Sequence, residues 1–176
     1  SEKLKYPEAR KGDVVDTYGT VKVPDPYRWM EDLNSPELKA WIEAQNQLTY
    51  SYLDRLPIRE HLRKRIAALW DYPKTTIPRL EGGKLFYRKN SGLQKQSPIY
   101  MRAGLAAPAT LLIDPNVRWP QGDIALQSFA PSPDAALLAY TTSEGGADWQ
   151  TIHILDVTKS SDLPDRIEWM RFSGIS

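Results

Sequence analysis

The spacing of hydrophobic and polar positions changes near residue 71 and divides the chain into two regions. In the first region, apolar side chains recur with the period of an α-helix. One such stripe runs from Pro36 to Leu53, at Leu38, Trp41, Ile42, Leu48 and Tyr52. A second stripe follows Pro57, at Ile58, Leu62, Ile66 and Leu69. The pattern predicts two amphipathic helices whose apolar faces have no obvious partner within the first 70 residues.

The signals at the ends of these helices are local. Ser35 is a good N-cap, Pro36 fits the first helical position, and Glu37 is favourable in the first turn. Pro73 follows the second stripe and disfavours helix in the residue before it. Residues 1–33 contain three prolines and two glycines. They indicate an extended arm with one edge strand at Thr20–Val23.

After residue 71, the chain shows short apolar runs separated by turn residues, which is typical of an antiparallel all-β architecture. The predicted strands are Leu85–Tyr87, Ile99–Met101, Leu111–Ile113, Ile124–Phe129, Leu137–Thr141, Ile152–Val157 and Ile167–Phe172. The intervening loops contain Gly82-Gly83, Pro115-Asn116 and Gly145-Gly146, residues that hairpin turns favour.

A faint internal repeat runs through these strands. The run that begins at Leu85 recurs 53 residues later at Leu138, and the run that begins at Ile99 recurs at Ile152 with the same shift. A repeated unit of this size is typical of a β-propeller blade. Closed propellers need about four to eight blades, whereas this region supplies about two. The chain also stops within a strand-like pattern, so we expect it to be part of a larger protein.

Composition and charge exclude several classes of function. Of the residues, 41% are hydrophobic and 26% are charged, which is ordinary for a soluble globular protein. The net charge of +1 gives no argument for a nucleic-acid or membrane partner. The absence of cysteine excludes disulfides and thiol nucleophiles. The first residues do not form a signal peptide, which favours a cytoplasmic protein, or a periplasmic one if a leader was removed.

The residues alone reveal no catalytic centre. There is no G-x-S-x-G motif, and two histidines without cysteine make a zinc site improbable, so we expect no metal or cofactor. His61 is predicted on a helix surface, and His153 is predicted to face outward from a strand. The adjacent carboxylates of Glu31 and Asp32 are better explained as charges that precede the N-terminus of a helix than as an acid–base pair. The basic residues of the second helix favour a solvated face over an anion site.

A set of motifs in fixed order resembles the prolyl oligopeptidase (prolyl endopeptidase) family of serine peptidases. The most specific is D-P-Y-R-W-M-E-D at Asp25–Asp32, followed by E-A-Q-N at Glu43–Asn46. Further matches are Tyr6-Pro7, Leu56–Arg59, Asp71–Lys74, Ser91–Gln94, Leu112–Asn116, Gly145–Thr151 and Trp169–Gly174. The resemblance therefore extends over almost the whole chain.

The resemblance implies an α+β fold in two parts. Residues 1–71 would be the helical N-terminal segment of an α/β-hydrolase peptidase domain, and residues 72–176 the first two blades or so of a seven-bladed β-propeller. The complete enzyme would cleave on the carboxyl side of proline in short peptides, with the propeller gating access. It would act as a monomer. The catalytic Ser, Asp and His would lie in the remainder of the protein, so the chain alone would be inactive.

Two residues match family positions that face the substrate cavity. Phe172 matches an aromatic residue that lines the pocket for the residue two before proline, and Asp148 matches an acidic residue near the site. From the sequence alone, Phe172 could instead be a core residue, and Asp148 an ordinary turn residue. Gln127 stands where some relatives carry Arg, and we assign it no role. A self-standing β-repeat interaction module without catalysis is the alternative to the peptidase hypothesis.

Overall fold

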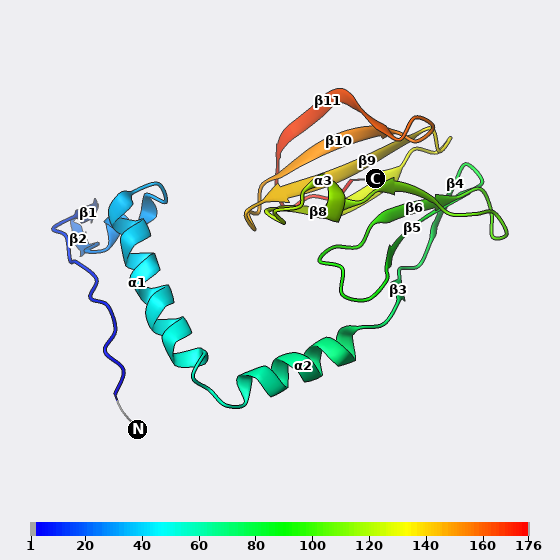
Figure 1. The fold of residues 1–176 in the computed structure, drawn as a ribbon. Coiled ribbons are helices and arrows are strands. Elements are labelled where there is room, and N and C mark those ends of the chain that lie inside the picture. Colours follow the sequence, from blue (N-terminus) through cyan, green and yellow to red (C-terminus); the bar gives the residue numbers. More distant parts are fainter. Residues whose placement is uncertain (1–2, 176) are drawn as a thin grey trace. The chain divides into compact units, whose positions relative to one another are not determined.

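The computed structural model describes residues 3–175 and contains two compact units, which divide after Arg65 within helix α2 (Figure 1). The first unit begins with an antiparallel hairpin of β1 (Val15–Tyr18) and β2 (Val21–Pro24), in which Gly19 has a φ of +62°. The strand predicted at Thr20–Val23 is confirmed as β2, but the expectation of a single strand in this arm is wrong, because β1 pairs with it. A two-residue turn with a left-handed glycine is sufficient to pair both sides.

The two predicted amphipathic helices are confirmed, although the second begins two residues after Pro57. A 3₁₀ helix, η1 (Arg28–Glu31), precedes α1 (Pro36–Leu53) and α2 (Arg59–Trp70). The Ser35 hydroxyl accepts a hydrogen bond from the Leu38 N–H at 3.4 Å, as an N-cap does. Leu38 is the only buried residue of α1, and α2 buries none, within the part of the chain that the structure describes. The predicted apolar stripe of α2 is therefore uncovered in these residues, and that of α1 is covered only in part.

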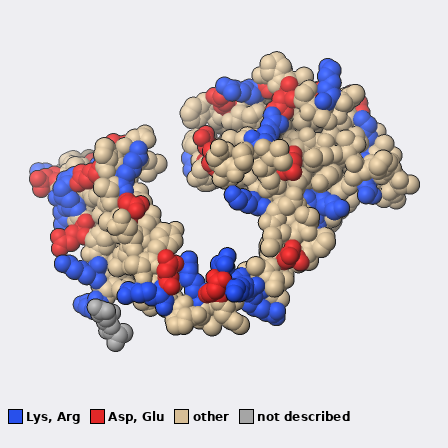
Figure 2. All heavy atoms as spheres, in the orientation of Figure 1, with Lys and Arg blue, Asp and Glu red and all other residues tan. Residues whose placement is uncertain are grey.

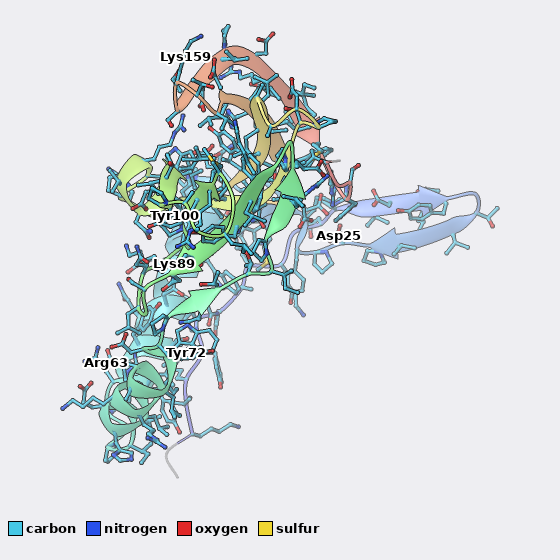
Figure 3. The ribbon with its side chains drawn as sticks, turned by 90° about the vertical axis from the view of Figure 1, so that its right-hand side faces the viewer. Asp25, Arg63, Tyr72, Lys89, Tyr100 and Lys159 are labelled. Atoms are coloured by element: carbon cyan, nitrogen blue, oxygen red, sulfur yellow. The ribbon has the colours of Figure 1, made fainter. Side chains whose placement is uncertain are left out.

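The basic residues of α2 form a solvated helix face, as predicted. Arg63 pairs with Glu60 at 2.9 Å, and Arg59 pairs with Asp54 at 3.2 Å. Figure 2 shows acidic side chains among the basic ones along this helix, and Figure 3 shows Arg63 pointing away from the ribbon. His61 is exposed on the same helix, which confirms its predicted surface position.

The second unit contains two antiparallel sheets. The first comprises β3 (Lys74–Thr75), β4 (Arg79–Glu81), β5 (Lys84–Asn90), β6 (Ile99–Arg102) and β7 (Thr110–Ile113). A short helix, α3 (Pro115–Arg118), leads to β8 (Ile124–Pro131), β9 (Leu137–Glu144), β10 (Gln150–Asp156) and β11 (Ser161–Met170). Within the second sheet, each strand pairs with the next along the chain. These sheets are consistent with two propeller blades.

Most predicted strands are confirmed, and the errors concern short or irregular ones. The sequence did not reveal β3 and β4, because two or three residues are too few to show an alternating pattern. The predicted strand Ile167–Phe172 is wrong at its end, because β11 begins at Ser161 and ends at Met170. Phe172 consequently lies two residues beyond the strand.

The 53-residue repeat is confirmed by the register of the strands. Tyr87 of β5 is paired with Tyr100 of β6, which Figure 3 labels, and their rings stack at 6.0 Å. At the equivalent position in the second sheet, Tyr140 of β9 is paired with His153 of β10, and their rings stack at 5.0 Å. The same register therefore carries a stacked pair in both sheets.

The hydrophobic core of the unit is shared by the two sheets. The first sheet contributes Phe86 and Ile99, both with no exposed surface. The second contributes Leu138, Tyr140 and Leu155, each at most 1% exposed. Because side chains alternate along a strand, His153 lies on the same face of β10 as Leu155. The prediction that His153 faces outward is therefore wrong. Its partly buried ring packs on Tyr140.

Candidate functional site

The two residues predicted from the family resemblance lie at one end of the second sheet. Asp148 is in the turn between β9 and β10, and Phe172 follows the end of β11. These ends are adjacent because Gln150 pairs with Met170. Arg171 connects the two positions: its Nη2 donates to the Asp148 carboxylate at 3.3 Å, and its guanidinium lies 4.5 Å from the centroid of the Phe172 ring.

Two tryptophans complete this group, which we call the Arg171 cluster: Asp148, Trp149, Trp169, Arg171 and Phe172. The Arg171 guanidinium lies 5.1 Å from the centroid of the Trp149 ring. Trp149 in turn meets Trp169 edge to face, with ring centroids 5.8 Å apart. The sequence reasoning missed both tryptophans and Arg171. Their positions next to Asp148 and Phe172 in the sequence were the available signal.

The backbone of the Arg171 cluster adopts a conformation that is uncommon for such residues. Trp169 has a φ of +65° and Phe172 a φ of +52°, in the left-handed region that bulky side chains rarely occupy. Observed outliers of this kind often occur at functional sites. Phe172 is 81% exposed, so it is not a core residue of the described chain.

A groove of about 440 Å³ lies beside the cluster. Its walls come from β8, from the ends of β9 and β10 with the turn between them, and from β11. The lining residues are Ile124, Thr142, Ser143, Glu144, Ala147, Trp149, Gln150, Thr151, Glu168 and Trp169. The groove thus combines two tryptophan rings, several hydroxyl groups and two carboxylates, and none of its lining residues is Lys or Arg.

A second polar group lies on the sheet face that carries Tyr140. The Tyr140 hydroxyl donates to Asp162 Oδ2 at 2.8 Å, and Asp162 also forms a salt bridge with Arg118. Burial, and then the bond to Asp162, raises the pKa of Tyr140. His153 Nε2 is 2.9 Å from the Thr142 hydroxyl, and burial is the main cause that lowers the pKa of His153.

This second group holds strands together and does not form a hydrolytic site. Thr142, the hydroxyl partner of His153, is buried, whereas a nucleophile must be reachable by its substrate. Tyr140 has no exposed surface. Arg118 follows the first sheet and Asp162 belongs to the last strand of the second, so their salt bridge ties the connecting segment to β11.

Two further findings concern residues 3–175. These residues contain no cluster of three or more His, Asp or Glu side chains arranged to bind a metal ion. None of their helices is both long enough and apolar enough to cross a membrane.

Comparisons with known proteins give a consistent result. A family model described as the prolyl oligopeptidase N-terminal β-propeller domain matches residues 6–176. The prolyl endopeptidase of Elizabethkingia meningoseptica is 39% identical over the whole chain, which covers 25% of that relative. Prolyl oligopeptidase A of Galerina marginata is 34% identical over 97% of the chain and 26% of the relative.

Solved structures agree with the sequence matches. A structure from a study of two prolyl endopeptidases, concerned with inter-domain dynamics in catalysis and specificity, superposes with a TM-score of 0.82 at 33% identity. The match covers 93% of this chain and 24% of that one. Prolyl oligopeptidase B of Galerina marginata, bound to a 35mer hydrolysis and macrocyclization substrate, gives 0.77 at 32% identity, over 97% and 27% of the two chains.

The chain thus spans about a quarter of the length of the relatives that it matches. The matching region includes both the helical unit and the two sheets, since it begins at residue 6. The chain belongs to the prolyl oligopeptidase family, within the part that is described as its N-terminal β-propeller domain.

Proposed function

We propose that this chain is the N-terminal part of a serine endopeptidase that hydrolyses peptide bonds on the carboxyl side of proline in short peptides. The observation that carries the proposal is the family match over residues 6–176, together with two relatives named prolyl endopeptidase that are 39% and 36% identical. Residues 1–71 then belong to an α/β-hydrolase peptidase domain, and residues 72–176 to a propeller that gates access. The remainder of the protein supplies the catalytic Ser, Asp and His.

The uncovered helices support this division. Large apolar side chains such as Leu62, Ile66 and Leu69 are about half exposed on α2, at 48%, 62% and 57%. A contiguous apolar surface of this kind usually has a partner. A peptidase domain formed with the remainder of the protein is the partner that the family match favours.

Within this enzyme, we assign substrate contacts to Phe172 and Asp148. The exposed ring of Phe172 gives an apolar wall for a substrate side chain, and Arg171 holds that ring beside the Asp148 carboxylate. An apolar wall binds substrate and transition state about equally well, so it contributes mainly to KM. Asp148 contributes through its field, so its effect depends on substrate charge and on salt.

The test uses the full-length protein and chromogenic peptides that contain proline. We expect hydrolysis after proline by the full-length protein, with covalent labelling by a serine-directed phosphonate, and none by residues 1–176 alone. For Phe172→Ala, we expect a loss of roughly 1–3 kcal/mol in kcat/KM, mostly through KM, with substrates long enough to reach the ring. A short substrate should be almost unaffected.

Two outcomes would contradict the proposal. Hydrolysis by residues 1–176 alone would show that the chain contains its own nucleophile. A full-length protein that folds but cleaves no proline peptide would favour the binding-module alternative. An equal loss of kcat with short and long substrates for Phe172→Ala would remove only the pocket assignment.

A further inference from the structure

The groove beside the Arg171 cluster exposes aromatic surface that the residues around it leave uncovered. Trp169 is 75% exposed and Trp149 is 46% exposed, although both line the groove. Trp169 holds this position with a left-handed backbone, at a φ of +65°. Exposed tryptophan on a strained backbone is costly, and it indicates a surface that gains from binding.

The charged residues that line the groove are all acidic, although Arg166 and Arg171 lie next to it. Its walls contain the carboxylates of Glu144 and Glu168 and no cationic side chain. Glu168 pairs with Arg166 at 3.1 Å, outside the groove lining. Glu144 has no ion pair among residues 3–175. The charge of the groove therefore complements a cation.

The adjacent Arg171 cluster already contains an example of how an aromatic ring and a carboxylate bind a cation. The Arg171 guanidinium lies over the Trp149 ring at 5.1 Å and donates to Asp148 at 3.3 Å. An aromatic face and a nearby carboxylate together bind a guanidinium or ammonium group well. On the groove side, Trp169 and Glu144 offer the same two components, and no cation lies over the Trp169 ring within residues 3–175.

We propose that this groove is a binding subsite for the cationic side chain of a peptide, Lys or Arg, with Trp169 as the aromatic face and Glu144 as the carboxylate. The choice of a peptide as the ligand rests on the proposed function, whereas the preference for a cation rests on the groove itself. The subsite would add a charge preference to an enzyme whose cleavage point is set by proline.

The experiment uses the full-length protein and pairs of proline-containing peptides that differ at one residue. One pair compares Lys with norleucine, which has a similar shape without the charge, and a second compares Arg with citrulline. The residue is moved along the peptide on both sides of proline. We expect the cationic member to bind about twofold to thirtyfold more tightly at one position, the range for a cation–π contact at exposed to desolvated sites. The preference should weaken as salt is added.

Two variants and one control assign the effect to the groove. Glu144→Gln keeps the shape and removes the charge, and Trp169→Asn removes the ring with a residue that tolerates the left-handed backbone. Each should reduce the preference for the cationic peptide. Asp165→Asn also removes an exposed carboxylate from β11, but Asp165 does not line the groove. It should leave the preference unchanged.

Equilibrium binding, followed by tryptophan fluorescence, separates this inference from the proposed function. If the protein cleaves no proline peptide but still prefers the cationic member of each pair, only the peptidase proposal fails. If the two members of each pair bind equally well, the subsite is disproved. The same conclusion follows if Asp165→Asn reduces the preference as much as Glu144→Gln does.

Discussion

The two sheets of the second unit share a 53-residue repeat, but equivalent turns in the two sheets contain different residues. Gly82 occupies the turn between β4 and β5 with a φ of +51°, and Ala135 occupies the equivalent turn between β8 and β9 with a φ of +54°. Only the first has the residue type that this backbone favours. The repeat therefore preserves the backbone conformation and not the amino acid.

The reason for the difference is that the two turns touch. A Cβ atom on Gly82 would lie 2.7 Å from the backbone carbon and oxygen of Asp134 and 2.8 Å from the Ala135 Cβ. Lys84 reinforces the contact by donating to the Ala135 carbonyl at 3.1 Å. There is space for one methyl group between the turns, and Ala135, with no exposed surface, supplies it.

The largest expected effect comes from exchanging the residue types of the two turns, with alanine in the first turn or glycine in the second. Gly82→Ala should destabilise the second unit by roughly 2–4 kcal/mol, because it combines overpacking with a left-handed alanine. Ala135→Gly should change stability by no more than about 1 kcal/mol, since relief of backbone strain offsets the buried methyl group that is lost. Urea unfolding of the full-length protein, followed through the second unit, measures both variants. Similar losses for the two would show that the turns are not in close contact.

The sequence predicted those parts of the fold that depend on local signals. The N-cap at Ser35 and the proline after it defined the start of α1 to the residue, because a cap acts within one turn of helix. Seven strands were identified from their apolar runs. The contact between Gly82 and Ala135 could not be predicted, because it depends on how two turns pack across the sheets.

The stacked pairs give a second comparison with a smaller expected effect. The hydroxyl of Tyr140 donates to Asp162 at 2.8 Å, whereas the contact that the structure gives the Tyr87 side chain in the equivalent pair is the stacking of its ring on Tyr100. Tyr140→Phe should cost roughly 1.5–3 kcal/mol, the range for a hydrogen bond to a charged group. Tyr87→Phe should remain within about 0.5 kcal/mol. The free energy of unfolding of each variant provides the test. Equal losses of stability in the two variants would mean that the hydrogen bond between Tyr140 and Asp162 does not stabilise the protein.

The candidate site could be predicted only in part, because the connection between its residues also depends on how separate segments of the chain pair. Asp148 and Phe172 were identified through family motifs, and their contact with substrate stays a prediction. Their connection through Arg171 depends on the pairing of Gln150 with Met170 and on the irregular end of β11. A periodicity argument extended that strand to Phe172 and could not detect the left-handed residues that end its regular course.

The smallest expected effect concerns His153, which stands where the first sheet has Tyr100. Burial is the main cause that lowers the pKa of His153 below its ordinary value of 6.5. Asp162 opposes that shift, while Arg118 and Arg166 add to it. The folded protein therefore binds this proton less readily than the unfolded chain does. Stability is fully present above about pH 6.5 and declines below it, until the pH falls beneath the folded pKa.

Replacing His153 should remove this loss of stability at low pH from the second sheet. We expect His153→Gln to be less sensitive than the wild type to a change from about pH 7.5 to about pH 5, in the hydrogen exchange of β9 and β10 amides. His61→Gln, on the exposed face of α2, is the matched control and should retain the wild-type profile in these strands. The amides of β5 and β6 should not change with His153, because Tyr100 provides the equivalent ring without an imidazole. If His153→Gln and the wild type lost protection equally at low pH, the decline would come from the carboxylates, and the histidine would differ from Tyr100 only in shape.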